Sequence, residues 1–223
     1  MAARNTKGVQ ICVVKDGVTA LTITPTAVSK AKPATVTAAN TLANGDLVKL
    51  ASDSTGLSEI DGKVWVVDNV SGTGFDLVGS DTTAATGTFA AGTAIDGYPA
   101  TDMQCLCLGS FSIAQATGGG DNNISVATFC DPTATVPSPI PAGATGGGSF
   151  SFTGYIDTTA ADYPVLLDLV ESGDATIMRI TLPQHGYIVA PTVFTELTWD
   201  VPVDGAMGYS GSGTFSSKPR HIW

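Results

Sequence analysis

Charged residues are scarce in this chain, and basic residues are the scarcest. Charged side chains make up 13% of its 223 residues, against about 25% in typical soluble domains. The formal net charge is −10, and neither Lys nor Arg occurs between Lys63 and Arg179, an interval with acidic residues from Asp68 to Asp174. Such a surface repels phosphate, which argues against a protein that grips DNA. An excess of acid also serves solubility alone, so both interpretations stay open.

Histidine is also too rare for a typical catalytic triad. His185 lies in a predicted turn and His221 lies two residues from the end of the sequence, so we do not expect a hydrolase. Asp200 and Asp204 have Pro202 between them, and we expect both to face water rather than to act as an acid–base pair. No calcium-loop spacing of Asp and Asn occurs. We therefore predict no enzymatic activity and no catalytic, cofactor-binding or metal-binding residue.

The few cysteines follow no recognisable pattern, and long apolar runs are absent. Cys105 and Cys107 have neither a Cys-x-x-Cys nor a zinc spacing, and we predict buried free thiols at all four positions: Cys12, Cys105, Cys107 and Cys130. No apolar run approaches the roughly 20 residues that span a membrane, and no signal peptide follows Met1. We expect no membrane segment and a protein that is made and used, or assembled, inside a cell.

Glycine and β-forming residues are plentiful, and most predicted elements are short strands. The 26 glycines and 12 prolines stand among many Thr, Val, Ala and Ser residues. This composition is typical of a β-rich assembly that hides much of its surface, or of an ordinary β-sandwich.

The predicted strands divide the chain into three segments. Residues 9–24 are predicted to form a β-hairpin. Residues 33–96 contain several strands spaced by about 8–12 residues, which is typical of a small barrel or sandwich. We interpret residues 33–96 as an inserted β module, because the strands on either side lack enough partners alone. Residues 1–32 and 97–223 then form one β-sandwich or partial barrel with a flanking α-helix.

One helix is predicted, from about Ala160 to Glu171. Thr158 or Thr159 caps it, and Pro164 falls in its first turn. Its apolar stripe consists of Tyr163, Leu166, Leu167 and Val170. Its acidic residues, Asp162, Asp168 and Glu171, are expected to be solvated. The strand before it has three predicted apolar anchors: Phe150, Phe152 and Tyr155.

Residues 194–215 form a predicted ribbon of two strands joined by an Asp204-Gly205 turn. One face of its first strand carries Leu197, Trp199, Val201 and Val203. Pro202 marks a sheet edge or a bend, because proline cannot donate a ladder hydrogen bond. The second strand continues the period of two through Met207, Tyr209, Gly211, Gly213 and Phe215.

Residues 149–223 together carry a family resemblance. The helical segment Tyr163-Pro-Val-Leu-Leu-Asp-Leu is followed by a strand with Arg179, by Leu182-Pro-Gln-His-Gly and by the ribbon with Leu-Thr-Trp-Asp-Val-Pro-Val-Asp-Gly. With Ile124-Ser-Val-Ala-Thr-Phe-Cys-Asp, this pattern resembles the major tail tube proteins of long-tailed, siphovirus-type bacteriophages. Residues 33–96 look like the short β modules that are spliced into tailed-phage structural proteins.

The resemblance implies a structural virion protein of the tail. Copies would form hexameric rings that stack into a tube, with one inner barrel through which viral DNA passes without specific binding during ejection. It also implies tape measure, tail terminator and tail tip proteins as partners, assembly in the host cytoplasm, and no cofactor. The module at 33–96 is expected on the outer surface, because an insert on the inner side would block the tube.

A soluble binding module is the alternative hypothesis. A sugar-binding or adhesin-like β-sandwich would present an exposed aromatic platform, for which Trp65, Trp199 and Trp223 are candidates. Under the tube hypothesis, we instead expect Trp199 and Leu197 to pack inward in the sheet core.

Overall fold

The computed structural model describes residues 9–51, 55–89, 94–114, 123–125, 139–141, 147–156, 162–182, 186–201 and 207–222. Several predicted features lie outside these ranges, namely Cys130, the caps Thr158 and Thr159, His185, Pro202 with Val203, the Asp204-Gly205 turn and Trp223.

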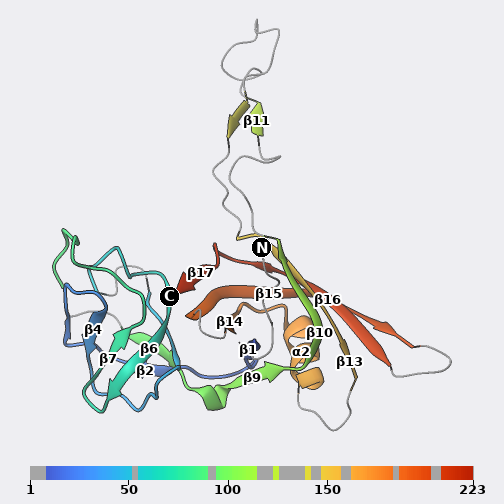
Figure 1. Ribbon diagram of the computed structural model, residues 1–223, viewed down its shortest axis with the longest axis horizontal. Coiled ribbons are helices and arrows are strands. Elements are labelled where there is room, and N and C mark those ends of the chain that lie inside the picture. Colours follow the sequence, from blue (N-terminus) through green and yellow to red (C-terminus); the bar gives the residue numbers. More distant parts are fainter. Residues whose placement is uncertain are drawn as a thin grey trace, which may run out of the picture.

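An eight-stranded antiparallel sheet forms the larger unit (Figure 1). Its strands follow the order β10-β13-β16-β15-β14-β1-β9, with β17 paired to β15. The bounds are Gln10–Val14 (β1), Met103–Leu106 (β9), Leu108–Ala114 (β10), Ser149–Tyr155 (β13), Thr176–Leu182 (β14), Gly186–Asp200 (β15), Gly208–Phe215 (β16) and Arg220–Ile222 (β17). The α-helix α2 (Asp162–Ser172) lies within the curl of this sheet.

A seven-stranded antiparallel sheet forms the smaller unit, at the left in Figure 1, in the order β2-β8-β5-β6-β7-β4-β3. Its bounds are Leu21–Ile23 (β2), Ala27–Val28 (β3), Ala34–Thr37 (β4), Leu47–Lys49 (β5), Val64–Ser71 (β6), Gly74–Leu77 (β7) and Ile95–Tyr98 (β8). A short 3-10 turn, η1 (Ala100–Asp102), precedes β9, and β11 (Asn123–Ser125) pairs with β12 (Pro139–Pro141). The predicted class, a mainly β protein with a partial barrel, a helix and a second sheet, is confirmed.

The strand pairing overturns the predicted hairpin over residues 9–24. β1 pairs with β14 and β9, whereas β2 pairs with β8 of the smaller sheet. Four consecutive residues of β1 are buried, from Ile11 to Val14, and a strand that is buried on both faces needs a neighbour on each side. The second sheet also takes in β2 and β3, which precede residue 33.

Aromatic side chains fill the core of the larger unit. Phe150 and Phe152 of β13, Phe194 of β15, and Tyr209 and Phe215 of β16 are each at most 3% exposed. Their ring centroids lie 5.1 to 6.3 Å apart in edge-on, tilted and stacked pairs. Such pairs contribute about 0.5–1.5 kcal/mol each beyond the burial of their area. Two of the three predicted anchors of β13 are therefore core residues.

Glycines in β16 make room for these rings. A Cβ atom on Gly211 would overlap the ring of Phe152, and one on Gly213 would overlap the ring of Phe150. The rings of β13 therefore lie across the neighbouring strand at positions where it has no side chain. The predicted period of two in the second strand of the ribbon is confirmed, with Tyr209, Gly213 and Phe215 buried.

Helix α2 packs on this aromatic core through a stripe that differs from the predicted one by one residue. Leu166 and Leu169 are buried, and Tyr163 and Val170 pack beside them. Leu167 was predicted in the stripe, but Leu169 takes that place, because the helix is rotated so that its first residue, Asp162, also faces the protein interior.

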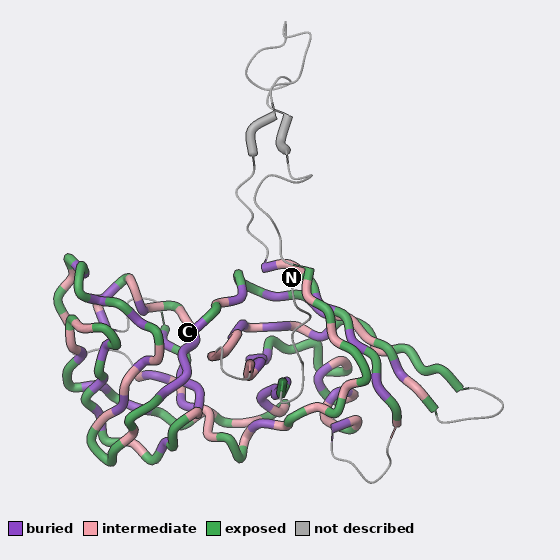
Figure 2. Tube along the Cα trace, viewed as in Figure 1, coloured by how far each residue is buried: buried purple, intermediate pink, exposed green. Residues whose placement is uncertain are grey.

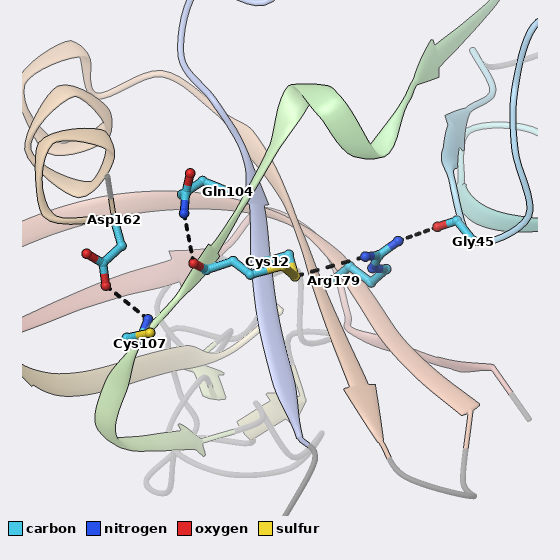
Figure 3. Close-up of a disulfide and its surroundings, with 7 residues drawn as sticks. Cys12, Gly45, Gln104, Cys107, Asp162 and Arg179 are labelled. Carbon is cyan, nitrogen blue, oxygen red and sulfur yellow. Dashed lines mark hydrogen bonds between the residues drawn. A yellow bond between two sulfur atoms is a disulfide. The ribbon is translucent and has the colours of Figure 1, made fainter. Parts of the chain in front are cut away.

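The sheet curls because β9 and β10 are consecutive strands that pair at opposite ends of it. Only Cys107 separates them, and its backbone N–H donates to Asp162 Oδ2 at 3.0 Å (Figure 3). The prediction of a solvated Asp162 is wrong, since this residue is 5% exposed. The Tyr163 N–H also donates to its carboxylate, at 2.9 Å. The first of these bonds ties the start of the helix to the corner of the sheet, and the second lies within the first turn of the helix.

Of the three cysteines that are described, the prediction of a buried free thiol is wrong for Cys12 and Cys105, and for Cys107 it is wrong about burial only. Cys12 and Cys105 are opposite each other in the register of β1 and β9 and form a disulfide (Figure 3). Cys107 is a free thiol, but it is exposed. The two bridged residues are 93 positions apart, and sequence spacing alone does not show that their strands are neighbours.

A shared apolar cluster and two arginines join the two units. The cluster combines residues of both sheets, including Val14, Ile177, Val189, Leu47, Val64 and Val66. Arg179 of β14 donates to the Gly45 carbonyl (Figure 3). Arg220 of β17 donates to the Val64 carbonyl at 2.8 Å, and its guanidinium lies 3.4 Å from the ring centroid of Trp65. Burial lowers the pKa of both guanidinium groups, that of Arg220 to about 10.

We predict that Gly213→Ala lowers the free energy of unfolding by about 1–3 kcal/mol, the usual cost of overpacking. The new methyl group would overlap the Phe150 ring and meet the Val193 carbonyl. Gly208→Ala on the same strand is the matched control, because a Cβ there meets no atom closer than 3.5 Å. Urea unfolding followed by circular dichroism compares the two variants. Equal losses of stability would contradict the role of the glycines.

Candidate assembly interface

No cluster of metal-binding side chains marks a chemical site in the part of the chain that the structure describes. No three His, Cys, Asp or Glu residues there are grouped so that they could hold a metal ion. None of the helices found in the same residues has the length and apolarity to cross a membrane. The features that stand out are instead the edges and faces of one part of the larger sheet.

This part, here called the four-strand arm, consists of β10, β13, β16 and residues 193–200 of β15. β14 pairs with β15 only up to Thr192, and β16 pairs with the other side of residues 192–200. Residues 193–200 therefore have a free edge within the described structure. Among the described strands, β10 pairs only with β13, so the described part of the arm also has a free edge there.

Neither free edge carries the Lys or Pro residues that commonly protect a sheet edge against further pairing. Edge strands of stable monomers commonly carry Lys or Pro, or are covered by another element. Residues 108–114 and 193–200 contain neither Lys nor Pro. Each edge has one register shift, between Leu108 and Ser110 in β10 and between Phe194 and Glu196 in β15. Beyond these shifts both backbones continue as strands, to Ala114 and to Asp200. Both edges can therefore accept a further strand.

One face of the arm, here called the hydroxyl face, carries small polar side chains. Exposed and buried residues alternate along its strands, as β13 shows (Figure 2). The register places Ser112, Ser151, Ser212 and Glu196 in one row, and Ser110, Thr153, Ser210 and Thr198 in the next. The hydroxyls bond across strands, at 2.8 Å between Ser110 and Thr153 and at 2.7 Å between Ser112 and Ser151.

The charge of the hydroxyl face is weakly negative. Glu196 and Asp200 are its exposed carboxylates, and no Lys or Arg occurs in any of the four strands. Asp200 was predicted to face water, and it is exposed. Tyr155, the third predicted anchor of β13, lies on this face and is 70% exposed, because an odd step along a strand from Phe152 reverses the side.

An apolar end, defined as Trp199, Val201 and Met207, extends the opposite face of the arm beyond the helix. These side chains are 51%, 64% and 44% exposed. The expectation that Trp199 packs in the core is therefore wrong, whereas Leu197 is half-buried against the aromatic cluster. Leu197 and Trp199 do lie on the same face of the strand, as predicted. The ribbon extends beyond the core, however, so Trp199 near its far end is exposed. The Trp199 indole N–H donates to the Tyr163 hydroxyl of α2 at 2.5 Å, which holds the ring in place.

Tyr209 lies beside this end and is buried without a partner for its hydroxyl. Its side chain is 3% exposed, and its oxygen accepts and donates no hydrogen bond within the described residues. Burial, followed by the nearby Asp162 and Cys107, raises the pKa of Tyr209 to about 12.

The three tryptophans do not form one aromatic platform in the described structure. Trp65 is 3% exposed and covered by Arg220, and Trp223 lies outside the described residues. Trp199 alone among the candidates is placed at the surface. Sequence reasoning missed the hydroxyl face, although the alternation Ser149-Phe-Ser-Phe-Thr displays it for one strand.

Comparisons with known proteins give weak structural similarities. No protein-family model matches the chain, and no curated protein matches it in sequence. A chain in the virion of a native gene transfer agent particle is similar with a TM-score of 0.39 and 14% identity, covering 55% of this chain and 91% of that one. A chain in the tail of an empty gene transfer agent particle with C6 symmetry has a TM-score of 0.33 and 13% identity, with 51% and 78% covered. Both TM-scores are below 0.5, so these similarities place no residue of this chain in an assembly.

We predict that the protein loses less stability at alkaline pH when Tyr209 is replaced by Phe. The folded-state pKa is about 12 and the unfolded one about 10, so folding favours the protonated phenol. Its contribution is complete below pH about 10 and is lost as the pH rises toward about 12. The variant should match or exceed the wild type in melting temperature at pH 7, because it removes an unsatisfied buried hydroxyl. The measurement is the melting temperature of both proteins at a series of pH values from 8 to about 12. If the melting temperature falls equally steeply with pH in both, the assignment to Tyr209 is contradicted.

Proposed function

We propose that this chain is a structural protein of a phage-type tail, and that its copies join edge to edge into rings that stack into a tail tube. The observation that carries the proposal is the four-strand arm with two unprotected edges, one covered apolar face and one hydroxyl face without basic residues. The family resemblance of residues 149–223 supports the same function.

The strand directions of the arm fit a closed ring. β10, β13, β16 and β15 are antiparallel in turn, so the two edge strands run in opposite directions. Rotation of a copy about a ring axis preserves these directions, and the β15 edge of one copy therefore meets the β10 edge of the next in antiparallel pairing. A closed barrel leaves no free edge. An odd number of strands in the arm would not allow antiparallel pairing at every junction.

The hydroxyl face fits the inner wall of such a barrel. The opposite face is covered by α2 and filled by the aromatic core, so the hydroxyl face is the one left to line a channel. Uncharged hydroxyls with two carboxylates per copy offer phosphate no cation to bind, and the weak negative charge keeps DNA from adhering.

The smaller unit fits the outer surface of the tube. It is joined to the larger unit through Arg179 and Arg220, and its contacts involve β1, β9, β14, β17 and the first half of β15. None of its strands contributes to the hydroxyl face. The absence of its strands from the hydroxyl face supports the proposal that the smaller unit is an inserted module on the outside of the tube. Its sheet begins at Leu21, before the predicted start at residue 33.

Light scattering and negative-stain microscopy of the purified full chain test the assembly. We expect rings or tubes to form with rising concentration. A protein that stays monomeric at every concentration and salt level would overturn the proposed function.

We predict that Ser151→Lys tubes retain short duplex DNA, whereas wild-type tubes do not. Each copy would add one lysine to the channel wall, and the retention should fall steeply with salt, since it depends on counterion release. Thr35→Lys is the matched control, because Thr35 is also an exposed strand hydroxyl with a hydrogen-bonded partner, Asp76, but lies on the smaller unit. Co-sedimentation with labelled DNA measures the effect. Equal retention by both variants would show that Ser151 does not line the channel.

A further inference from the structure

The core of the larger unit has an open mouth beside the β10 edge. An apolar groove of about 510 Å³ lies there, here called the aliphatic groove. Six half-buried side chains that pack on the aromatic cluster line it: Leu106, Leu108, Phe111, Ile113, Leu182 and Ile188. No charged residue lines it. Solvent thus reaches apolar side chains that continue directly from the buried core, which is typical of a surface that a partner covers.

The apolar end lies at the other edge of the same arm. Trp199, Val201 and Met207 are exposed apolar residues at the far end of β15 and the start of β16. Trp199 is held by its bond to Tyr163, so its ring is already oriented. A pre-oriented tryptophan that docks in an apolar pocket is a common energetic centre of protein interfaces.

Both features lie on the same face of the arm. Phe111 and Ile113 pair with Phe152 and Phe150, and Trp199 pairs with Tyr209. Paired residues in antiparallel strands point to the same side, and Phe150, Phe152 and Tyr209 all point into the core. If two copies pair edge to edge, the side chains of the β15 edge therefore stand next to those of the β10 edge on the side away from the hydroxyl face.

We infer that the apolar end of one copy docks in the aliphatic groove of the next copy of this chain. This inference rests on the proposed ring and names the contact that would hold it together. The backbone pairing sets the direction of the junction, and Trp199 and Val201 cover the open mouth of the neighbour's core. The same contact closes the groove and removes the exposed apolar end, and neither surface brings a charge that would have to be desolvated.

Val201→Asp tests the inference, because this residue is 64% exposed in the single copy and its replacement should leave the fold intact. We expect the concentration needed for ring formation to rise by about tenfold or more, with an unchanged melting temperature of the monomer. Leu21→Asp is the matched control, an exposed apolar strand residue of the smaller unit at 36%, and should assemble like the wild type. Normal rings from Val201→Asp would overturn the inference and leave the proposed function standing, whereas a wild type without rings would overturn the function itself.

A mixing experiment identifies the partner surface. At the concentration where the wild type just forms rings, Val201→Lys and Ile113→Glu should each fail to assemble alone. An equimolar mixture should recover rings, because the lysine at position 201 of one variant then meets the glutamate at position 113 of the other at alternate junctions. Failure of the mixture, with both monomers folded by circular dichroism, would overturn the pairing of these two surfaces.

Trp199 gives an independent signal: its emission should shift to the blue when wild-type rings form, and Trp199→Phe rings should lack that shift. An unchanged wild-type emission would contradict the docking of the indole.

Discussion

The stacking of aromatic rings on glycine is the contact on which the rest of the larger unit depends. Phe150 and Phe152 extend over Gly213 and Gly211 of the next strand, so aromatic rings in contact with one another cover one face of the arm. Helix α2 packs on this layer through Leu166 and Leu169. With the core aromatic rings on that side, the other side can consist largely of Ser and Thr. The two faces therefore have a common origin in the alternation of large and small residues along β13 and β16.

The distribution of charge follows the division into two units. Arg179 and Arg220 both reach backbone carbonyls of the smaller unit and are thereby used at the junction. The buried guanidinium groups have lowered pKa values, and Arg220 is further stabilised by the face of Trp65. The guanidinium groups of Arg179 and Arg220 are thus engaged at the junction and not on the arm. The scarcity of cations in the sequence and the absence of Lys and Arg from the hydroxyl face are two aspects of one arrangement.

The proposed ring explains features that are costly in a single copy. An open sheet edge without Lys or Pro invites uncontrolled pairing, and an apolar end beside an apolar groove exposes surface that water disfavours. Both are removed together when the β15 edge of one copy meets the β10 edge of the next. The exposed Trp199, which the soluble binding hypothesis would use for a sugar, then has a partner within the assembly. Its orientation by Tyr163 suits a contact that forms repeatedly in the same geometry.

The sequence by itself determined the β class, the helix near residues 162–172, the alternation in residues 207–215 and the lack of cations along most of the chain, because these depend on residue types and on local spacing. Only the tertiary structure decided that β1 leaves its predicted hairpin partner, that Cys12 meets Cys105 and that Asp162 is buried against Cys107. It also decided that Trp199 passes beyond the core and that the edges of β10 and β15 stay free. Each of these depends on which distant strands become neighbours, and a period of two within one strand carries no information about the strand beside it.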